Sequence, residues 1–195
     1  LSHNSHHALH LCGCGVLHNL NERNTELMKK NGHDEAYIAE NQLDLRKLLT
    51  VASLIEEETA SATESHMIAS VIYNRLYNWG KEPPFLNIDA AIFYALGYHK
   101  ESLTSEDLQI DSPYNTYKND GLPPGAISNP GIDALYATLF PTPPQSSSGK
   151  DIDAYFFVAN DAGKTYYASS KSGHENNVAQ AKKDNEAIKN GTYED

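Results

Sequence analysis

The chain has 195 residues, of which 39% are hydrophobic and 21% are charged, and it carries a formal net charge of −11. This length fits one domain with a substantial core and leaves room for a short appended segment. The acidic excess argues against nucleic acid or an anionic membrane surface as a partner, because both are themselves negatively charged.

Tyrosine is abundant, with twelve residues against five phenylalanines and one tryptophan. Its ring is flat and half polar, which suits contacts with the neutral parts of a polymer, although packing inside the protein would explain most of these residues equally well. No apolar run approaches the roughly 20 residues that a membrane-spanning helix needs, and the apolar segment of a signal peptide is missing. We expect either a cytosolic protein or a soluble portion of a larger one.

Residues 1–20 differ from the rest of the chain. They hold five of the nine histidines and both cysteines, Cys12 and Cys14, so the remaining residues contain no disulfide framework. Thiolate and imidazole groups favour zinc, but their spacing here matches no closed four-ligand pattern. We expect a leader or an added segment with no metal site. Residues 21–44 have a helical composition, and we interpret them as a helical lead-in to a main domain at 45–195.

The most apolar run of the chain, at 48–55, ends in the three carboxylates Glu56, Glu57 and Glu58. Asp44 is suited to cap the helix that this run predicts. On a helical wheel Glu57 points to solvent, whereas Glu56 and Glu58 lie on the two shoulders of the buried face. A half-desolvated carboxylate has a raised pKa and can donate a proton near neutral pH. A helix that simply ends in an acidic cluster would show the same pattern, and the spacing does not choose between Glu56 and Glu58.

From this helix to residue 110 the pattern alternates between helices and short loops. Apolar residues recur at helical spacing, and glycines mark the expected helix ends. The predicted elements are a helix at 66–79 capped by Ser65 and closed by Gly80, a loop at 81–87, a helix at 90–96 capped by Asp89 and closed by Gly97, and a helical turn that opens at 104–107.

A long irregular region at 111–131 carries several prolines and glycines. Such a loop is unusual in a compact domain and tends to be functional. The elements predicted after it are a helix at 132–140, a surface excursion at 141–149, a hairpin of strands 154–159 and 164–168, and a last helix that begins at His174. The expected fold class is α+β, mainly helical, with a small antiparallel hairpin and a long loop that lines a cleft.

Several motifs follow one another along the chain. They are A-S-L-I-E-E-E-T at 52–59, V-I-Y-N-R-L at 71–76, an aspartate at Asp89, S-P-Y-N-T-Y at 112–117, G-L-P-P-G-A-I-S-N-P-G at 121–131, and Y-F-F-V-A at 155–159 with the later His174 and Asn176. Any one of these motifs is weak, but together and in this order they resemble the MltG (YceG-like) family of endolytic murein transglycosylases. The resemblance covers about residues 48–178 and identifies 45–195 as the YceG-like catalytic domain.

The resemblance implies an enzyme that cuts peptidoglycan glycan strands internally at the MurNAc–GlcNAc β-1,4 bond and leaves 1,6-anhydroMurNAc ends. It assigns the role of catalytic acid and base to Glu56. It implies no cofactor and no metal. The residues it marks as substrate-binding are Asn74, Asp89, Tyr114, Asn115, Thr116 and His174, and those it marks as supporting are Glu58, Arg75 and Ser112.

Structural roles would explain several of these residues about as well. Glu58 would then be a carboxylate that supports the cleft from a helix end, and Arg75 would pair with a nearby carboxylate such as Asp89. A packing or capping role is at least as reasonable for His174. The segment 121–131 would be scaffolding for the loop before it.

The sequence departs from the family pattern in three places. The segment 86–91 lacks the usual Gln and Pro-Thr pair, and His174 and Asn176 are separated by one residue. We also interpret the sequence as lacking the membrane helix and the LysM-like domain of the family. We expect the catalytic domain of a protein that is tethered to the outer face of the bacterial cytoplasmic membrane, with cell-wall synthesis proteins as candidate partners. The alternatives are a non-catalytic peptidoglycan-binding scaffold of the cell-wall machinery and a muramidase-type hydrolase.

Overall fold

The computed structural model describes residues 44–59, 61–78, 80, 85–100 and 102–194. The predicted leader, and the predicted lead-in apart from Asp44, lie outside the described residues. The elements in chain order are α3 (Leu45–Glu58), α4 (Ala62–Tyr73), the π-helical turn η1 (Asn74–Asn78), α5 (Asp89–Leu96), the 3-10 turn η2 (Asp107–Gln109), α6 (Ile132–Leu139), β1 (Phe156–Ala159), β2 (Thr165–Ala168) and α7 (Lys171–Lys189). The predicted α+β class, mainly helical, is confirmed.

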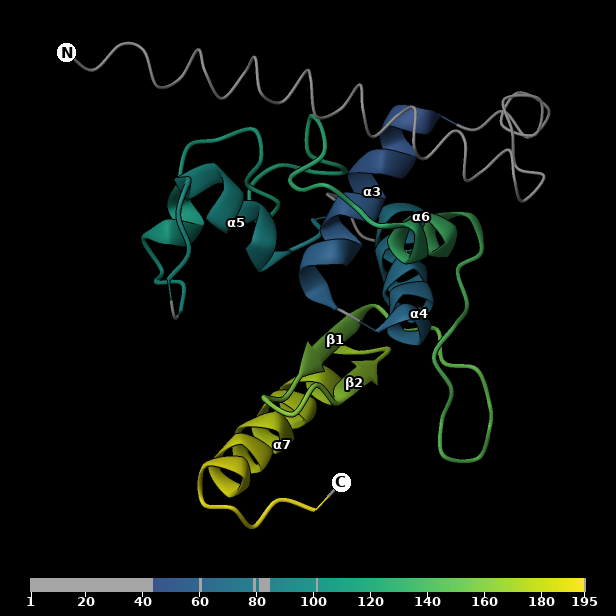
Figure 1. Cartoon of the computed structure of the whole chain (residues 1–195), viewed down its shortest axis with the longest axis vertical. Helices are drawn as coiled ribbons and strands as arrows, with labels where there is room; N and C mark the ends of the chain where they lie inside the picture. The colour runs from purple at the N-terminus through teal and green to yellow at the C-terminus, as the bar shows by residue number, and fades with distance from the viewer. Residues whose placement is uncertain (1–43, 60, 79, 81–84, 101, 195) are drawn as a thin grey trace.

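Three helices form the core. Figure 1 shows α3, α4 and α6 together at the centre, with α5 on one side and the hairpin and α7 extending from one end. The apolar faces of the central helices meet in one cluster, because each helix repeats aliphatic residues at helical spacing. The buried side chains at this junction include Leu54, Ile55, Ile68, Ile72, Ala134 and Leu135. Among the described residues, no helix is both long enough and apolar enough to cross a membrane.

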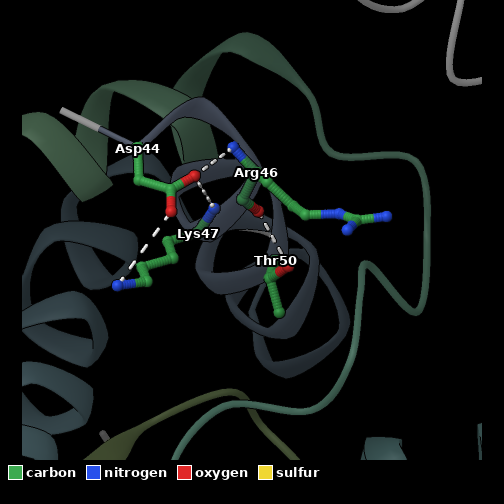
Figure 2. Close-up of polar contacts among 4 residues, drawn as sticks. All are labelled: Asp44, Arg46, Lys47 and Thr50. Carbon is green, nitrogen blue, oxygen red and sulfur yellow. Dashed lines mark hydrogen bonds and ion pairs between the residues drawn. The ribbon is translucent and has the colours of Figure 1, made fainter.

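The start of α3 is capped as predicted (Figure 2). The Asp44 carboxylate oxygen Oδ1 accepts hydrogen bonds from the backbone amides of Arg46 and Lys47 at 3.0 and 3.2 Å. Further along the helix, the buried Ser53 accepts a hydrogen bond from the Ile127 amide on its hydroxyl, and its carbonyl accepts one from the Ser128 hydroxyl. These two bonds attach the long loop 111–131 to α3.

The predicted cap of the second helix is wrong. Ser61 caps α4, with its hydroxyl accepting from the Glu64 amide at 3.4 Å, and Ser65 is buried inside the helix. Ser61 and Glu64 form the S-x-x-E spacing of a capping box. Thr59 completes it, since its hydroxyl accepts from the Ser61 amide and donates to the Glu64 carboxylate at 2.9 Å.

The next helix begins one residue earlier than predicted. Asp89 is the first residue of α5 and not its cap, and Ile88 occupies the N-cap position without a side-chain hydrogen bond. Gly97 ends α5 as predicted, with a φ of 77° that suits glycine. The carboxylate of Asp89 therefore does not cap the helix, and the residue is exposed.

The hairpin and α7 form the second part of the fold. The predicted hairpin is present, with β1 and β2 paired antiparallel and Phe157 opposite Tyr167. Its strands begin later than the predicted 154 and 164. The last helix begins at Lys171, capped by Ser170, so His174 lies in its first turn and does not begin it. A buried carboxylate joins α7 to the hairpin. Asp184 of α7 accepts hydrogen bonds from the Tyr166 hydroxyl at 2.5 Å and from the Asn160 side-chain amide at 3.1 Å.

The segment predicted as a surface excursion is only partly exposed. Figure 1 shows the connection between α6 and β1 looping away from the helices. Pro144 is nonetheless fully buried, and its carbonyl accepts the Ile152 amide at 2.8 Å. The excursion is thus fixed at its base.

Candidate active site

A cavity of about 670 Å³ lies where the end of α3 meets the start of α5, the η1 turn and the hairpin. We call it the first cavity. Its polar groups come from several different segments, and aromatic and aliphatic side chains supply the remaining wall, which is the usual composition of a ligand site. Its lining includes Glu58, Arg75, Asp89, Tyr117, Phe156 and His174.

Glu58 is the last residue of α3 and is half-buried at the cavity wall. Burial raises the pKa of its carboxyl to about 7, the charge of Asp89 adds to the rise, and a backbone hydrogen bond from Ala90 opposes it. Near neutral pH this carboxyl is therefore divided between its protonated and ionised forms. Such a group can both donate and accept a proton.

Asp89 places a second carboxylate in the same cavity. The hydroxyl of Tyr117 donates a hydrogen bond to its Oδ1. Burial and this bond raise the pKa of the Tyr117 hydroxyl above its ordinary value. This hydrogen bond orients the Asp89 carboxylate in the cavity that Glu58 also lines.

Arg75 forms part of the cavity floor. Its guanidinium donates to the Phe85 carbonyl at 2.9 Å, to the Tyr155 carbonyl at 3.2 Å and to the Asn87 side-chain oxygen at 2.6 Å, and it lies 5.3 Å from the centre of the Phe156 ring. Burial lowers its pKa. These contacts connect the η1 turn with the segment before α5 and with the hairpin.

His174 also lines the first cavity. Its ring stacks on Phe156 with 5.1 Å between the ring centres. Burial, and then the charge of Arg75, lower the pKa of the imidazole, so it is neutral at pH 7. Its Nδ1 atom is buried and has no hydrogen-bond partner among the described residues. A ligand hydroxyl in the cavity could supply that partner.

Glu56, the predicted catalytic residue, lies outside this cavity. It is exposed, and its Oε2 accepts the Gly131 backbone amide at 3.0 Å. Two residues along a helix are about 200° apart. The two shoulders of α3 therefore face different surroundings: Glu56 faces the end of the long loop, and Glu58 faces α5. The catalytic role of Glu56 stays a prediction.

Four other predicted residues have structural positions. Asn115 and Thr116 are buried, and their side chains bond to backbone groups of Leu108, Ile110 and Ile88. The Asn74 amide donates to the Ala154 carbonyl at 3.0 Å, and the Ser112 hydroxyl accepts the Tyr114 amide at 3.2 Å. None of these four lines the first cavity. The sugar contacts of Asn74, Asn115 and Thr116 stay predictions.

Tyr114 also lies outside the first cavity. Its ring contacts Tyr94 of α5, with 4.7 Å between the ring centres. Sequence reasoning missed Tyr117 and Phe156 as site residues, although both belong to motifs that it singled out. Tyr117 ends the S-P-Y-N-T-Y segment, and Phe156 belongs to the Y-F-F-V-A segment, whose Phe157 also lines the cavity.

No three His, Cys, Asp or Glu side chains of the described residues are arranged to hold a metal ion.

The chain is similar to known proteins over most of its length. The sequence model of the YceG-like family matches residues 15–180, so it begins well before the predicted boundary at 45. An endolytic murein transglycosylase of Bacillus subtilis is 40% identical over 76% of this chain, and one of Streptococcus pneumoniae serotype 2 is 37% identical over 73%. The chain spans only 39% and 25% of the lengths of these two relatives.

A solved structure agrees with the fold. The crystal structure at 2.6 Å of a yceG-like protein, lmo1499, from Listeria monocytogenes aligns with a TM-score of 0.61 and 40% identity. The alignment covers 71% of this chain and 42% of that one.

Proposed function

Because this chain belongs to the YceG-like family, we propose that it is the catalytic part of an endolytic murein transglycosylase. It cuts peptidoglycan strands internally at the MurNAc–GlcNAc β-1,4 bond and leaves 1,6-anhydroMurNAc ends. The names of the curated relatives support this activity. A charge of −11 is compatible with a substrate that is gripped through its sugars.

The observation that carries the proposal is the position of Glu58. Its carboxyl faces a cavity large enough for sugar rings, and its pKa of about 7 matches the pH at which a proton donor must also act as a base. We therefore assign the catalytic role to Glu58 in place of Glu56. Arg75, Phe156 and His174 contribute the surrounding surface for the sugars.

The reaction needs a single acid that acts twice. Glu58 first gives its proton to the glycosidic oxygen as the bond from that oxygen to the anomeric carbon breaks. The Asp89 carboxylate stabilises the positive charge that develops on the sugar. The Glu58 carboxylate then takes the proton of the muramoyl 6-hydroxyl, whose oxygen bonds to the anomeric carbon. Glu58 ends protonated, as it began, and the second step is favoured because it is intramolecular.

A muramidase-type hydrolase is the second candidate. The presence of a second carboxylate, Asp89, in the first cavity favours it. Hydrolytic glycosidases use two carboxylates, and the second acts as a nucleophile or activates a water. Asp89 occupies the same cavity as Glu58 and is thus available for either role.

The mass of the products separates these candidates. Purified glycan strands digested by the protein should yield fragments with anhydro ends, which are lighter by one water than fragments with reducing ends. Reducing ends throughout would assign the protein as a hydrolase. Binding to the strands without any cleavage would assign it as a non-catalytic scaffold.

The cellular setting follows from the substrate. Peptidoglycan lies outside the cytoplasmic membrane, so we place the activity at the outer face of that membrane. We further propose that the full-length protein is membrane-tethered there, with cell-wall synthesis proteins as its partners. The reaction as written needs no cofactor.

A further inference from the structure

Among the described residues, Asn87 is the one residue other than glycine with a positive φ, which is 52°. Asparagine tolerates this left-handed conformation better than most residues, but the conformation is uncommon, and such positions cluster at active sites and ligand sites. Asn87 lines the first cavity. The mechanism proposed above gives it no role.

A buried threonine fixes the backbone around Asn87. The Asn87 amide donates to the Thr116 carbonyl at 3.1 Å, and the next amide, of Ile88, donates to the Thr116 hydroxyl oxygen at 2.9 Å. Thr116 is itself 2% exposed. The protein core therefore sets the position of Asn87 before any ligand binds, as a preorganised site requires.

Arg75 decides which way the side-chain amide of Asn87 is turned. Its guanidinium donates to Oδ1 of Asn87 at 2.6 Å. A guanidinium can only donate, so the atom that faces it must be the oxygen. The nitrogen Nδ2 lies at the other end of this planar group, and it makes no hydrogen bond to the residues that the structure describes. Two N–H donors of Asn87 therefore remain for a ligand of the first cavity.

The ligand group that fits these donors is a neutral carbonyl with an apolar neighbour. The carboxylates of Glu58 and Asp89 line the same cavity and disfavour an anionic group there. Phe85 and Leu86, the two residues before Asn87, add apolar surface to the lining. An acetamido group combines the two requirements, because its carbonyl accepts a hydrogen bond and its methyl group is apolar.

We propose that Asn87 recognises the acetamido group of a murein sugar in the first cavity. Both sugars of murein carry this group on the carbon next to the anomeric carbon. Nδ2 of Asn87 donates to the acetamido carbonyl, and Arg75 is the positioning residue that turns the amide. The contact selects N-acetylated strands and also fixes the neighbouring carbon at which the bond breaks. This inference rests on the proposed function, since it assigns a part of the same substrate.

The test uses two neutral oligosaccharides that differ only in this group. Chitopentaose carries an acetamido group on each sugar, and cellopentaose carries a hydroxyl in its place. Isothermal titration calorimetry gives the ratio of their dissociation constants for the wild type and two variants. Asn87→Asp keeps the oxygen that Arg75 binds but loses the N–H donors, and Asn87→Gly keeps the left-handed backbone but loses the side chain. Asn129→Asp makes the same change at an exposed asparagine outside the cavity and is the matched control.

We expect the wild type and Asn129→Asp to bind chitopentaose more tightly than cellopentaose by about threefold to tenfold, the effect of one hydrogen bond between neutral groups. In both Asn87 variants this ratio should fall by about the same factor. A purely structural role would give another pattern, because Asn87→Asp keeps the bond to Arg75 and would then keep the ratio. Circular dichroism shows whether each variant is folded.

Three outcomes would overturn this inference. They are equal affinity of the wild type for the two oligosaccharides, no binding of chitopentaose by the wild type, and a ratio that survives in either Asn87 variant. Release of fragments from purified sacculi is measured on the same wild-type preparation. Where cleavage is retained, these outcomes remove only the role of Asn87, and the proposed function stands. Absence of cleavage by the wild type would instead refute the proposed function, whatever the ratio of affinities.

Discussion

Glu56 and Glu58 differ in surroundings although only one residue separates them on α3. Glu58 faces the first cavity with a pKa of about 7, and Glu56 is exposed and bonded to the Gly131 amide. Glu58→Gln should therefore lower kcat by about 10²–10⁴-fold, because an amide cannot donate the proton. Glu56→Gln should change kcat by less than about fivefold. Release of soluble fragments from purified sacculi measures both.

The converse result, with Glu56→Gln inactive and Glu58→Gln active, would restore the assignment made from the sequence. Glu57→Gln is the matched control, because Glu57 is exposed and lies between the two.

The pH dependence of kcat/KM gives a second prediction at this scale. The reaction starts from protonated Glu58, so kcat/KM should fall about tenfold per pH unit above a break near 7. Asp89 raises the pKa of Glu58 by its charge. Asp89→Asn should therefore move the break to lower pH, while burial keeps it above the ordinary value of a glutamate. A break that stays in place would show that Asp89 does not act on the proton donor.

Asn115 provides a third prediction, and it concerns stability. Its amide donates to the carbonyls of Leu108 and Ile110, its oxygen accepts the Tyr117 amide, and it is fully buried. Asn115→Ala would leave these backbone groups unpaired, which should lower the free energy of unfolding by about 2–4 kcal/mol. Urea denaturation measures the loss. Asn129→Ala, an exposed residue of the same loop, should change stability by less than about 0.5 kcal/mol.

At the scale of elements, the fourth prediction concerns the cap at the start of α4. Ser61→Ala removes the capping hydroxyl and should cost about 1 kcal/mol of unfolding free energy. Ser65→Ala should cost less, because the Ser65 amide still donates to the Ser61 carbonyl and alanine favours helices. Thermal unfolding of the two variants compares them. A larger loss in Ser65→Ala would show that α4 begins where the sequence analysis placed it.

The elements that could be predicted are those with local signals. The Asp44 cap, the helix end at Gly97 and the hairpin turn depend on residues within a few positions of one another, and the structure has all three. The cap of α4 was equally local, but the S-x-x-E pattern of Ser61 and Glu64 was overlooked in favour of Ser65.

The site was harder to predict because its geometry depends on distant segments. Whether Glu56 or Glu58 faces the cavity is decided by which shoulder of α3 meets α5, and that contact joins residues far apart in sequence. Asn115 shows the same limit. A polar residue on a loop with a proline predicts a ligand contact. Here the Asn115 side-chain amide instead donates to backbone carbonyls five and seven residues away.

At the scale of the whole molecule, the proposed proton donor should reduce stability. The carboxyl of Glu58 has a pKa of about 7 in the folded chain against 4.5 as its ordinary value. Between these two pH values the folded state binds more protons than the unfolded state. The free energy of unfolding therefore falls as pH rises from about 4.5 to beyond 7, by at most about 3.4 kcal/mol from this group alone.

Glu58→Gln removes this dependence, because an amide does not ionise. The variant should melt at a higher temperature than the wild type at pH 8 and at nearly the same temperature at pH 4, and calorimetry at the two pH values measures the difference. Since Glu58→Gln is also expected to lose activity, a gain in stability at pH 8 would separate loss of the proton donor from damage to the fold. A lower melting temperature at pH 8 would instead mean that the ionised carboxylate is stabilised where it lies, which would contradict its role as the acid.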